Sequence, residues 1–159
     1  MKKFHFFAAI ACVSFTLVAA ANAKQTFTIT QSKPDIQHVD VGAAGMSIGD
    51  VLAFEATFTT QDGKNGRMFG LLTLVSLPTS DKDTLLDRIG TIALDFGNSD
   101  SLVVNGQSVY GTYHGEIKDN APQVRAITGG TGKYIGARGQ ISTTRLASGA
   151  YEHVIQLVD

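Results

Sequence analysis

Residues 126–141 read Ala-Ile-Thr-Gly-Gly-Thr-Gly-Lys-Tyr-Ile-Gly-Ala-Arg-Gly-Gln-Ile, and five of these sixteen residues are glycine. Glycine at this density indicates a backbone that needs a positive φ, or that lies close to another segment of backbone. The stretch therefore either cradles a ligand or turns sharply between strands, and the fold depends on which of the two holds.

Nucleotide binding is the first interpretation to test. A P-loop requires serine or threonine after its lysine, but Tyr134 follows Lys133. A dinucleotide fingerprint requires glycine at position 135, which is Ile135, and only residues 142–159 remain for the rest of a βαβ unit. Nucleotide binding is therefore not expected, and a turn between strands is favoured.

Outward from this stretch, the chain consists of short apolar segments separated by turn residues. In residues 51–60, alternation places Leu52, Phe54, Ala56 and Phe58 on one face. Residues 67–77 are apolar on both faces, which suggests that one face lines an interior and a partner subunit covers the other. Further strands are expected at residues 26–30, 88–96, 101–104, 125–128, 140–146 and 151–158, with residues 113–118 as another candidate.

Seven to nine strands predict an all-β sandwich or barrel. Residues 84–88 could form one helical turn at most, and residues 32–50 are expected to be irregular. Asn105-Gly106 is a turn signal that should end a short strand. A barrel is favoured because closure removes sheet edges, which a secreted chain without disulfides has reason to avoid.

The first 23 residues have the pattern of a secretory signal peptide. Lys2 and Lys3 precede an apolar stretch, and Ala21-Asn22-Ala23 matches an A-x-A cleavage site. The apolar stretch is short for a transmembrane span, so no membrane insertion is expected. We expect residues 24–159 to be exported as one domain, to the periplasm or the medium.

The composition of residues 24–159 excludes several classes of function. Because the only cysteine, Cys12, lies in the signal peptide, neither disulfides nor thiolate chemistry is expected. Without Lys2 and Lys3 the domain has 11 basic and 14 acidic residues, a net charge of −3, and no basic cluster. Nucleic acid is therefore not an expected partner.

Few polar residues are candidates for chemistry. Asp95 has the most apolar neighbours of any carboxylate, and burial would raise its pKa and suit it to act as an acid; alternatively it faces solvent at a strand end. Tyr110 and Tyr113 could supply a phenol to a cavity or pack with the hydroxyl at its rim. Glu55, opposite in face to Phe54, is expected to point outward.

No metal site or nucleophile motif is expected. His38, His114 and His153 are not at ligand spacing with one another, and a histidine in a strand is usually a surface or rim residue. No G-x-S-x-G motif occurs, so hydrolase chemistry has no support. Lys133 and Arg138 are expected at a turn and a strand edge, with solvated side chains.

Taken with its spacing to Gly49-Asp50-Val51-Leu52-Ala53-Phe54, the glycine-rich stretch resembles the allene oxide cyclase and dirigent barrels. The match also includes Asp62-Gly63, Phe96-Gly97 and Ser101-Leu102-Val103-Val104, and residues 126–141 are its most specific part. The resemblance implies an eight-stranded antiparallel barrel of calycin type, often trimeric, with an apolar cavity and no cofactor.

The resemblance also implies a kind of chemistry. The plant cyclases convert a fatty-acid-derived allene oxide into a cyclopentenone, and the dirigent relatives steer the coupling or cyclisation of phenolic intermediates. In both, a cavity would confine a reactive molecule in one productive conformer and exclude water. An apolar or phenolic small molecule is the expected ligand, and a homotrimer is the expected assembly.

Residue by residue, the resemblance transfers poorly for chemistry. Phe54 matches the cavity phenylalanine of the cyclases, but Ala56 stands where they place an asparagine that holds a water. Their cavity cysteine aligns with Thr73, and their tyrosine falls near Ser108, with Tyr110 two positions away. The chain keeps the barrel pattern and lacks most polar groups of the allene oxide site.

Three functions from different classes are consistent with these patterns. A cyclase or dirigent-like enzyme would bring a carboxylate and a tyrosine together inside the barrel, and the catalytic candidates are Asp95 and Tyr110. A lipocalin-like carrier would have a large, purely apolar cavity, whereas a structural protein would have none. The residues expected to line a cavity are Leu52, Phe54, Ala56, Phe58, Phe69, Leu71 and Thr73.

Overall fold

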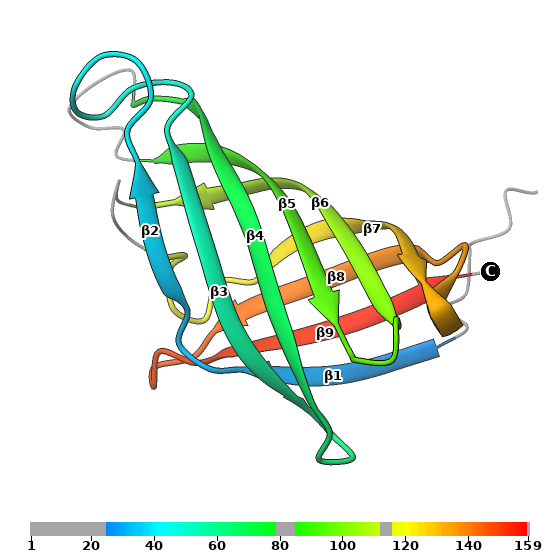
Figure 1. Ribbon diagram of the computed structural model, residues 1–159. Coiled ribbons are helices and arrows are strands. Elements are labelled where there is room, and N and C mark those ends of the chain that lie inside the picture. The colour runs from blue at the N-terminus through cyan, green and yellow to red at the C-terminus, as the bar shows by residue number, and fades with distance from the viewer. Residues whose placement is uncertain (1–24, 79–84, 112–115, 159) are drawn as a thin grey trace, which may run out of the picture.

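The structure, a computed structural model, describes residues 25–78, 85–111 and 116–158, and it confirms the all-β prediction (Figure 1). Its strands are β1 (Gln25–Gln31), β2 (Asp35–Val39), β3 (Val51–Thr60), β4 (Asn65–Ser76), β5 (Leu86–Asp95), β6 (Ser101–Tyr110), β7 (Gln123–Thr131), β8 (Arg138–Arg145) and β9 (Tyr151–Val158). One short 3-10 helix, η1 (Gly132–Tyr134), follows β7. Among the described residues, no helix is long and apolar enough to cross a membrane.

The strands form a closed antiparallel barrel with eight strand positions. Neighbours in sequence pair with each other from β2 to β9, β9 pairs with β1, and β1 closes the barrel by pairing with β3. The end of β3 pairs with β1, in the register Ile29↔Thr60, while its start pairs with β2, in the register Val39↔Val51. Because β1 and β2 contact different halves of β3, they occupy one strand position between them.

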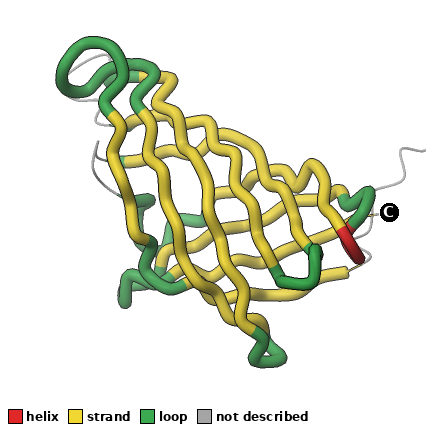
Figure 2. The backbone as a smooth tube through the Cα atoms, viewed as in Figure 1, coloured by secondary structure: helices red, strands yellow, loops and turns green. Residues whose placement is uncertain are grey.

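The first and last strands lie side by side along their whole length. The register runs from Gln25↔Leu157 to Gln31↔Tyr151, so the start of β1 is next to the end of β9 (Figure 1). The connections lie at the two ends of the barrel (Figure 2). The loop between β2 and β3 is held by Asp50, whose carboxylate accepts hydrogen bonds from the backbone N–H groups of Val41 and Ser47.

The glycine-rich stretch is a turn between strands, as favoured from the sequence. It covers the end of β7, the helix η1 and the start of β8. Gly132 has φ +57° and Gly139 has φ +155°, values that other residues adopt with difficulty. A Cβ on Gly139 would also lie 1.9 Å from the carbonyl oxygen of Gln156 on β9. The glycines of residues 126–141 therefore permit a tight turn and close packing of the backbone against β9.

Aromatic side chains fill the half of the barrel next to this turn, which we call the closed half and define by Phe27, Phe58, Phe96 and Tyr134. The ring of Phe96 lies 5.1 Å from that of Phe58 and 5.0 Å from that of Tyr134, between centroids. Phe58 is 1% exposed and packs over Gly66, where a Cβ would lie 2.2 Å from its ring. Such close ring contacts bury much apolar surface.

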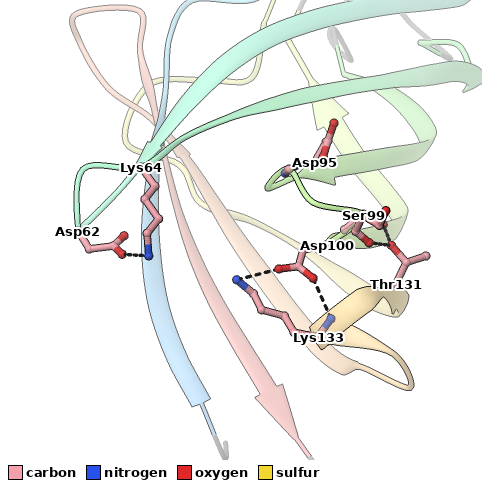
Figure 3. A network of polar contacts seen from close by, with 9 residues as sticks. Asp62, Lys64, Asp95, Ser99, Asp100, Thr131 and Lys133 are labelled. Carbon is pink, nitrogen blue, oxygen red and sulfur yellow. Dashed lines mark hydrogen bonds and ion pairs between the residues drawn. The ribbon is translucent and has the colours of Figure 1, made fainter.

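Polar contacts surround the closed half on the outside (Figure 3). The Asp100 carboxylate accepts a hydrogen bond from the backbone N–H of Lys133 at 2.9 Å and pairs with its ammonium group at 3.3 Å. The backbone hydrogen bond is the main reason why the pKa of Asp100 is lowered. Lys133 also lies over the Tyr134 ring, 4.9 Å from its centroid. Asp100 and Lys133 thus fix the helix η1 against the turn before β6.

Several boundaries differ from the sequence prediction. Residues 35–39 form β2 rather than irregular chain. Residues 86–88 belong to β5, in which Leu86 to Asp95 alternate in burial. The predicted turn at Asn105-Gly106 is wrong, since β6 continues to Tyr110. Residues 116–118 are not in a strand, whereas Tyr113, His114 and the predicted signal peptide lie outside the described residues.

Gly106 is not a turn residue. It lies within β6, opposite Gly90 on β5, with φ +149°. A Cβ there would lie 3.4 Å from the Cβ of Arg125 on β7. That distance is an ordinary van der Waals contact, so the positive φ is what favours glycine at this position.

The prediction for the cavity face of β4 is wrong. Phe69 and Leu71 are 41% and 55% exposed on the outer face, and Thr73 lies on that face too. Met68 and Leu72 instead point inward, opposite Ala56 and Leu52 of β3. The error has a physical reason, since a strand that is apolar on both faces carries no alternation from which to choose the inner one.

Candidate functional site

The interior beyond the closed half contains a cavity of about 60 Å³. We call this part the open half and define it by the cavity wall. Most wall residues are apolar, and a polar group gathers where β1, β6, β7, β8 and β9 come together. The wall consists of Gln31, Pro34, Ile36, Leu52, Phe54, Met68, Leu72, Ile92, Leu94, Val104, Tyr110, Glu116, Ile117, Arg125, Ile141, Thr143, Tyr151 and His153.

Some of the predicted site residues lie in the cavity wall, and the others lie elsewhere in the core or on the outer face. Leu52, Phe54 and Tyr110 line the cavity. Ala56 and Phe58 are buried but do not belong to the wall. The outward positions of Phe69, Leu71 and Thr73 exclude them from it.

Asp95 is not inside the barrel, so its prediction as a cavity acid is wrong. Ile92 and Leu94 point inward, and alternation therefore turns Asp95 outward at the end of β5. There its carboxylate accepts a hydrogen bond from the backbone N–H of Gly97 at 2.8 Å. The other interpretation of the sequence, that Asp95 faces solvent at the end of a strand, agrees with this position. Glu55 also points outward, as expected, and pairs with Arg67.

Tyr110 lies at the centre of the polar group. Its hydroxyl oxygen accepts a hydrogen bond from the Ser108 hydroxyl at 3.3 Å and another from Nη2 of Arg125 at 3.4 Å. The guanidinium group of Arg88 lies over the Tyr110 ring, 4.3 Å from its centroid, in cation–π geometry. Both hydrogen bonds use the Tyr110 oxygen as acceptor, and among the described residues none accepts the Tyr110 proton.

Two arginines are buried in the interior, and one of them faces the cavity. Arg125 is 5% exposed, lines the cavity, and its Nε has no hydrogen-bond partner. Among the described residues, no ion pair joins Arg125 to a carboxylate. Arg88 is equally buried but is not part of the wall. A buried charge without a partner is costly, so Arg125 is an unusual residue to find in a barrel interior.

His153 is a buried residue of the cavity wall, so its assignment to the surface or rim is wrong. Its Nδ1 lies 3.0 Å from the Thr143 hydroxyl and its Nε2 lies 2.8 Å from Oε1 of Gln31. Burial, and then the positive charge of Arg125, lower the pKa of His153 to about 3. The imidazole is therefore neutral at physiological pH, with Nε2 donating to Gln31 and Nδ1 accepting from Thr143.

A carboxylate also reaches the cavity wall. Glu116 lines it and pairs with Arg145, which in turn pairs with Asp119. The pKa of Tyr151 is raised, mainly by burial and then by the charge of Glu116. Tyr110, Tyr151 and Glu116 therefore meet at one cavity, which is the combination expected for an enzyme rather than for a carrier or a structural protein.

The sequence contained a signal for some of the residues that were missed. In β9, Tyr151, His153 and Ile155 alternate with outer residues, so the pattern places His153 inside. In β5, Arg88 shares a face with Ile92 in the same way. No such signal exists for Arg125, since its neighbour Val124 is apolar but 56% exposed. Among the described residues, no group of three or more histidine, cysteine, aspartate or glutamate side chains could hold a metal ion.

No protein-family model matches the sequence, and no curated protein matches it. The structure is similar to a pyocyanin demethylase, with a TM-score of 0.65 and 19% identity over 84% of this chain and 100% of the other. It is similar to a nonspecific heme-binding cyclase that catalyses a 4 + 2 cycloaddition in neoabyssomicin biosynthesis, with a TM-score of 0.63 and 17% identity over 86% of this chain and 65% of the other. It is also similar to a pterocarpan synthase dirigent protein, with a TM-score of 0.54 and 19% identity over 94% and 98% of the two chains.

These similarities establish the fold. The chain is an eight-stranded antiparallel barrel of the cyclase and dirigent type, and the resemblance inferred from the glycine-rich stretch is confirmed at that level. Because a fold of this kind can carry many activities, function has to be argued from the cavity itself.

Proposed function

We propose that the barrel binds a small apolar molecule with an oxygen function and promotes its cyclisation or rearrangement by proton donation from Tyr110. The observation that carries this proposal is the environment of the Tyr110 hydroxyl. The hydroxyl oxygen accepts hydrogen bonds from Ser108 and Arg125. Because no described residue accepts the hydroxyl proton, this proton is free to point into the cavity that Tyr110 lines. A general acid must be within hydrogen-bond reach of the atom that it protonates, and a molecule bound in this cavity would come within that reach of Tyr110.

The surrounding residues suit the charge changes of such a step. When Tyr110 gives its proton to a carbonyl or epoxide oxygen, a phenolate forms. Arg125, bonded to the hydroxyl oxygen, and Arg88, over the ring, would both stabilise that negative charge. The product returns a proton to Tyr110, so the isomerisation conserves all atoms. The apolar wall around Leu52 and Ile92 would hold the reacting molecule in one conformer.

The first test is native mass spectrometry of residues 24–159 purified from its own host. We expect a small molecule that is released on denaturation, whose identity then supplies the substrate for assays. The Tyr110→Phe variant should bind this molecule as tightly as the wild type but convert it at least about 100-fold more slowly. An unchanged rate would exclude Tyr110 as the acid, and binding without conversion in the wild type would support a carrier instead.

A protein without a bound molecule would need a second measurement. Fluorescent fatty acids and phenolics should then be taken up by the wild type with micromolar affinity. Failure of all these probes would contradict the proposal and favour a structural barrel.

We further propose that the domain is exported and that it self-associates as a homotrimer. The signal-peptide pattern supports export, and the exposed side chains of Phe69, Leu71 and Ile89 support a subunit contact on the outer face of β4 and β5. N-terminal sequencing of the native protein should begin at Lys24. Sedimentation should give three times the monomer mass for the wild type and a smaller species for Leu71→Glu, and a monomeric wild type would contradict the assembly.

A further inference from the structure

We infer that the cavity selects an organic acid, whose carboxylate binds Arg125 while its apolar part lies along the wall toward Pro34 and Ile36. This inference rests on the proposed function and adds the chemical class of the ligand. It begins from Arg125, whose side chain is directed into the cavity, is almost wholly buried, and leaves Nε without a hydrogen-bond partner.

The charges that face Arg125 leave it uncompensated. Arginine stays protonated at any physiological pH. Glu116, the carboxylate of the cavity wall, is already engaged by Arg145. His153 is neutral, and its two ring nitrogens are occupied by Gln31 and Thr143. Burial raises the pKa of Tyr151, so this tyrosine of the wall adds no negative charge at neutral pH. Among the residues that the structure describes, the cavity wall therefore carries one positive charge without a countercharge, which a ligand can neutralise.

The geometry favours a carboxylate over a more highly charged group. One guanidinium group, that of Arg125, lines the cavity, because Arg88 is outside the wall. A ligand with a single negative charge would balance it. Carboxylate oxygens match the planar donors of arginine, and the vacant Nε is one of them. A phosphate dianion would keep an unbalanced charge among the apolar residues Leu72, Ile92 and Val104.

The size of the cavity restricts the acid. A volume of about 60 Å³ has room for roughly four to six water-sized groups, at 10–15 Å³ for each. A carboxylate and a short apolar segment fill this space. A longer ligand has to continue past Phe54 and along β2, where Pro34 and Ile36 extend the apolar wall.

The test compares an acid with its neutral amide on residues 24–159. Hexanoate and hexanamide have nearly the same shape, so calorimetric titration of each at pH 7.5 isolates the charge. We expect the wild type to bind hexanoate at least tenfold more tightly than hexanamide. Arg125→Gln should lower the affinity for hexanoate until it no longer exceeds the affinity for hexanamide. Arg67→Gln, which removes the same charge from an exposed arginine on the outer face, should bind like the wild type.

The outcomes separate the two proposals. Equal binding of hexanoate and hexanamide by the wild type would overturn the preference for an acid and leave an apolar binding cavity intact. Binding of neither compound would contradict both the acid and the proposed function. Because the comparison of the two ligands uses the wild type, it holds even if Arg125→Gln fails to fold. An acid preference that survives in a folded Arg125→Gln protein would also overturn the assignment to Arg125.

Discussion

The closed and open halves of the barrel interior differ in what their side chains contribute. The closed half is filled by stacked and edge-on aromatic rings, with Gly66 allowing Phe58 to approach the backbone. The open half contains a cavity whose wall includes a buried arginine and a buried histidine. The first arrangement maximises burial of apolar surface, whereas the second places costly polar groups where a hydrophobic core would be more stable. The difference supports the proposal that the open half binds a ligand, whereas the closed half stabilises the fold.

The largest expected effect comes from the turn beside the closed half. Gly139→Ala would place a methyl group against the backbone of β9 at a φ that alanine avoids. We expect a loss of about 4 kcal/mol or more in the free energy of unfolding, measured by urea denaturation, or failure to fold. Gly129→Ala is the matched control in the same stretch, because nothing lies within 4 Å of its added methyl group, and it should cost less than about 1 kcal/mol. Equal effects would contradict this account.

The next largest effect on the free energy of unfolding is expected for a phenylalanine inside the barrel, compared with one on its outer face. Phe58→Ala removes a buried ring from the closed half and should lower the free energy of unfolding by about 3 kcal/mol. Phe69→Ala removes a ring from the outer face and should lower it by less than about 1 kcal/mol in the monomer. The measurement is the urea midpoint of both variants at low protein concentration. A larger loss for Phe69→Ala would indicate that its face is covered even then.

The open half should respond to acid through His153. Its pKa is lowered from 6.5 to about 3, so between these values the unfolded chain binds a proton that the native imidazole does not. Stability should therefore be fully present above pH 6.5 and fall as the pH drops toward about 3, by up to about 1.4 kcal/mol per pH unit for this one proton.

His153→Gln is the variant that tests this pH dependence. Urea midpoints measured from pH 4 to pH 8 should fall less steeply on acidification than in the wild type. An unchanged slope in His153→Gln would show that the histidine is not the group responsible.

The smallest effect has the opposite sign. Arg125→Met keeps the length of the side chain and removes a buried charge, so we expect it to raise the free energy of unfolding by about 1 kcal/mol in the absence of ligand. Arg67→Met, on the exposed face, should change it by less than about 0.5 kcal/mol. Thermal unfolding without ligand measures both. A clear destabilisation by Arg125→Met would indicate that the arginine supports the fold.

Where the sequence alternated between apolar and polar residues, it predicted the structure well. The pattern of β3 placed Leu52 and Phe54 inside, and both line the cavity. The glycines of residues 126–141 were correctly interpreted as a turn, because the motifs for nucleotide binding were incomplete. These predictions depended on local chemistry, which a strand or a turn expresses directly in its residue types.

The cavity chemistry was harder to predict, because it depends on which strands meet around the interior. Arg125 comes from β7 and Glu116 from the segment before it, whereas Gln31 and His153 are 122 residues apart and are joined by a hydrogen bond. Strand β4 carried no alternation, so nothing in the sequence indicated that Phe69 would point outward. Polar residues inside a barrel also run against the usual rule of burial, and Arg125, unlike His153, had no alternation to indicate its inward position.

Because Gln25 pairs with Leu157, the same barrel could be formed by a chain that starts at a different strand. Because β1 and β9 are neighbours in the barrel, a short linker could join the two ends without disturbing any pair. New ends could then be opened in the exposed hairpin between β3 and β4, where Gly63 has open space around it. The closed barrel therefore does not depend on where the chain starts. Circular permutants opened at this hairpin would keep the cavity intact, and both of their termini would lie beside the closed half.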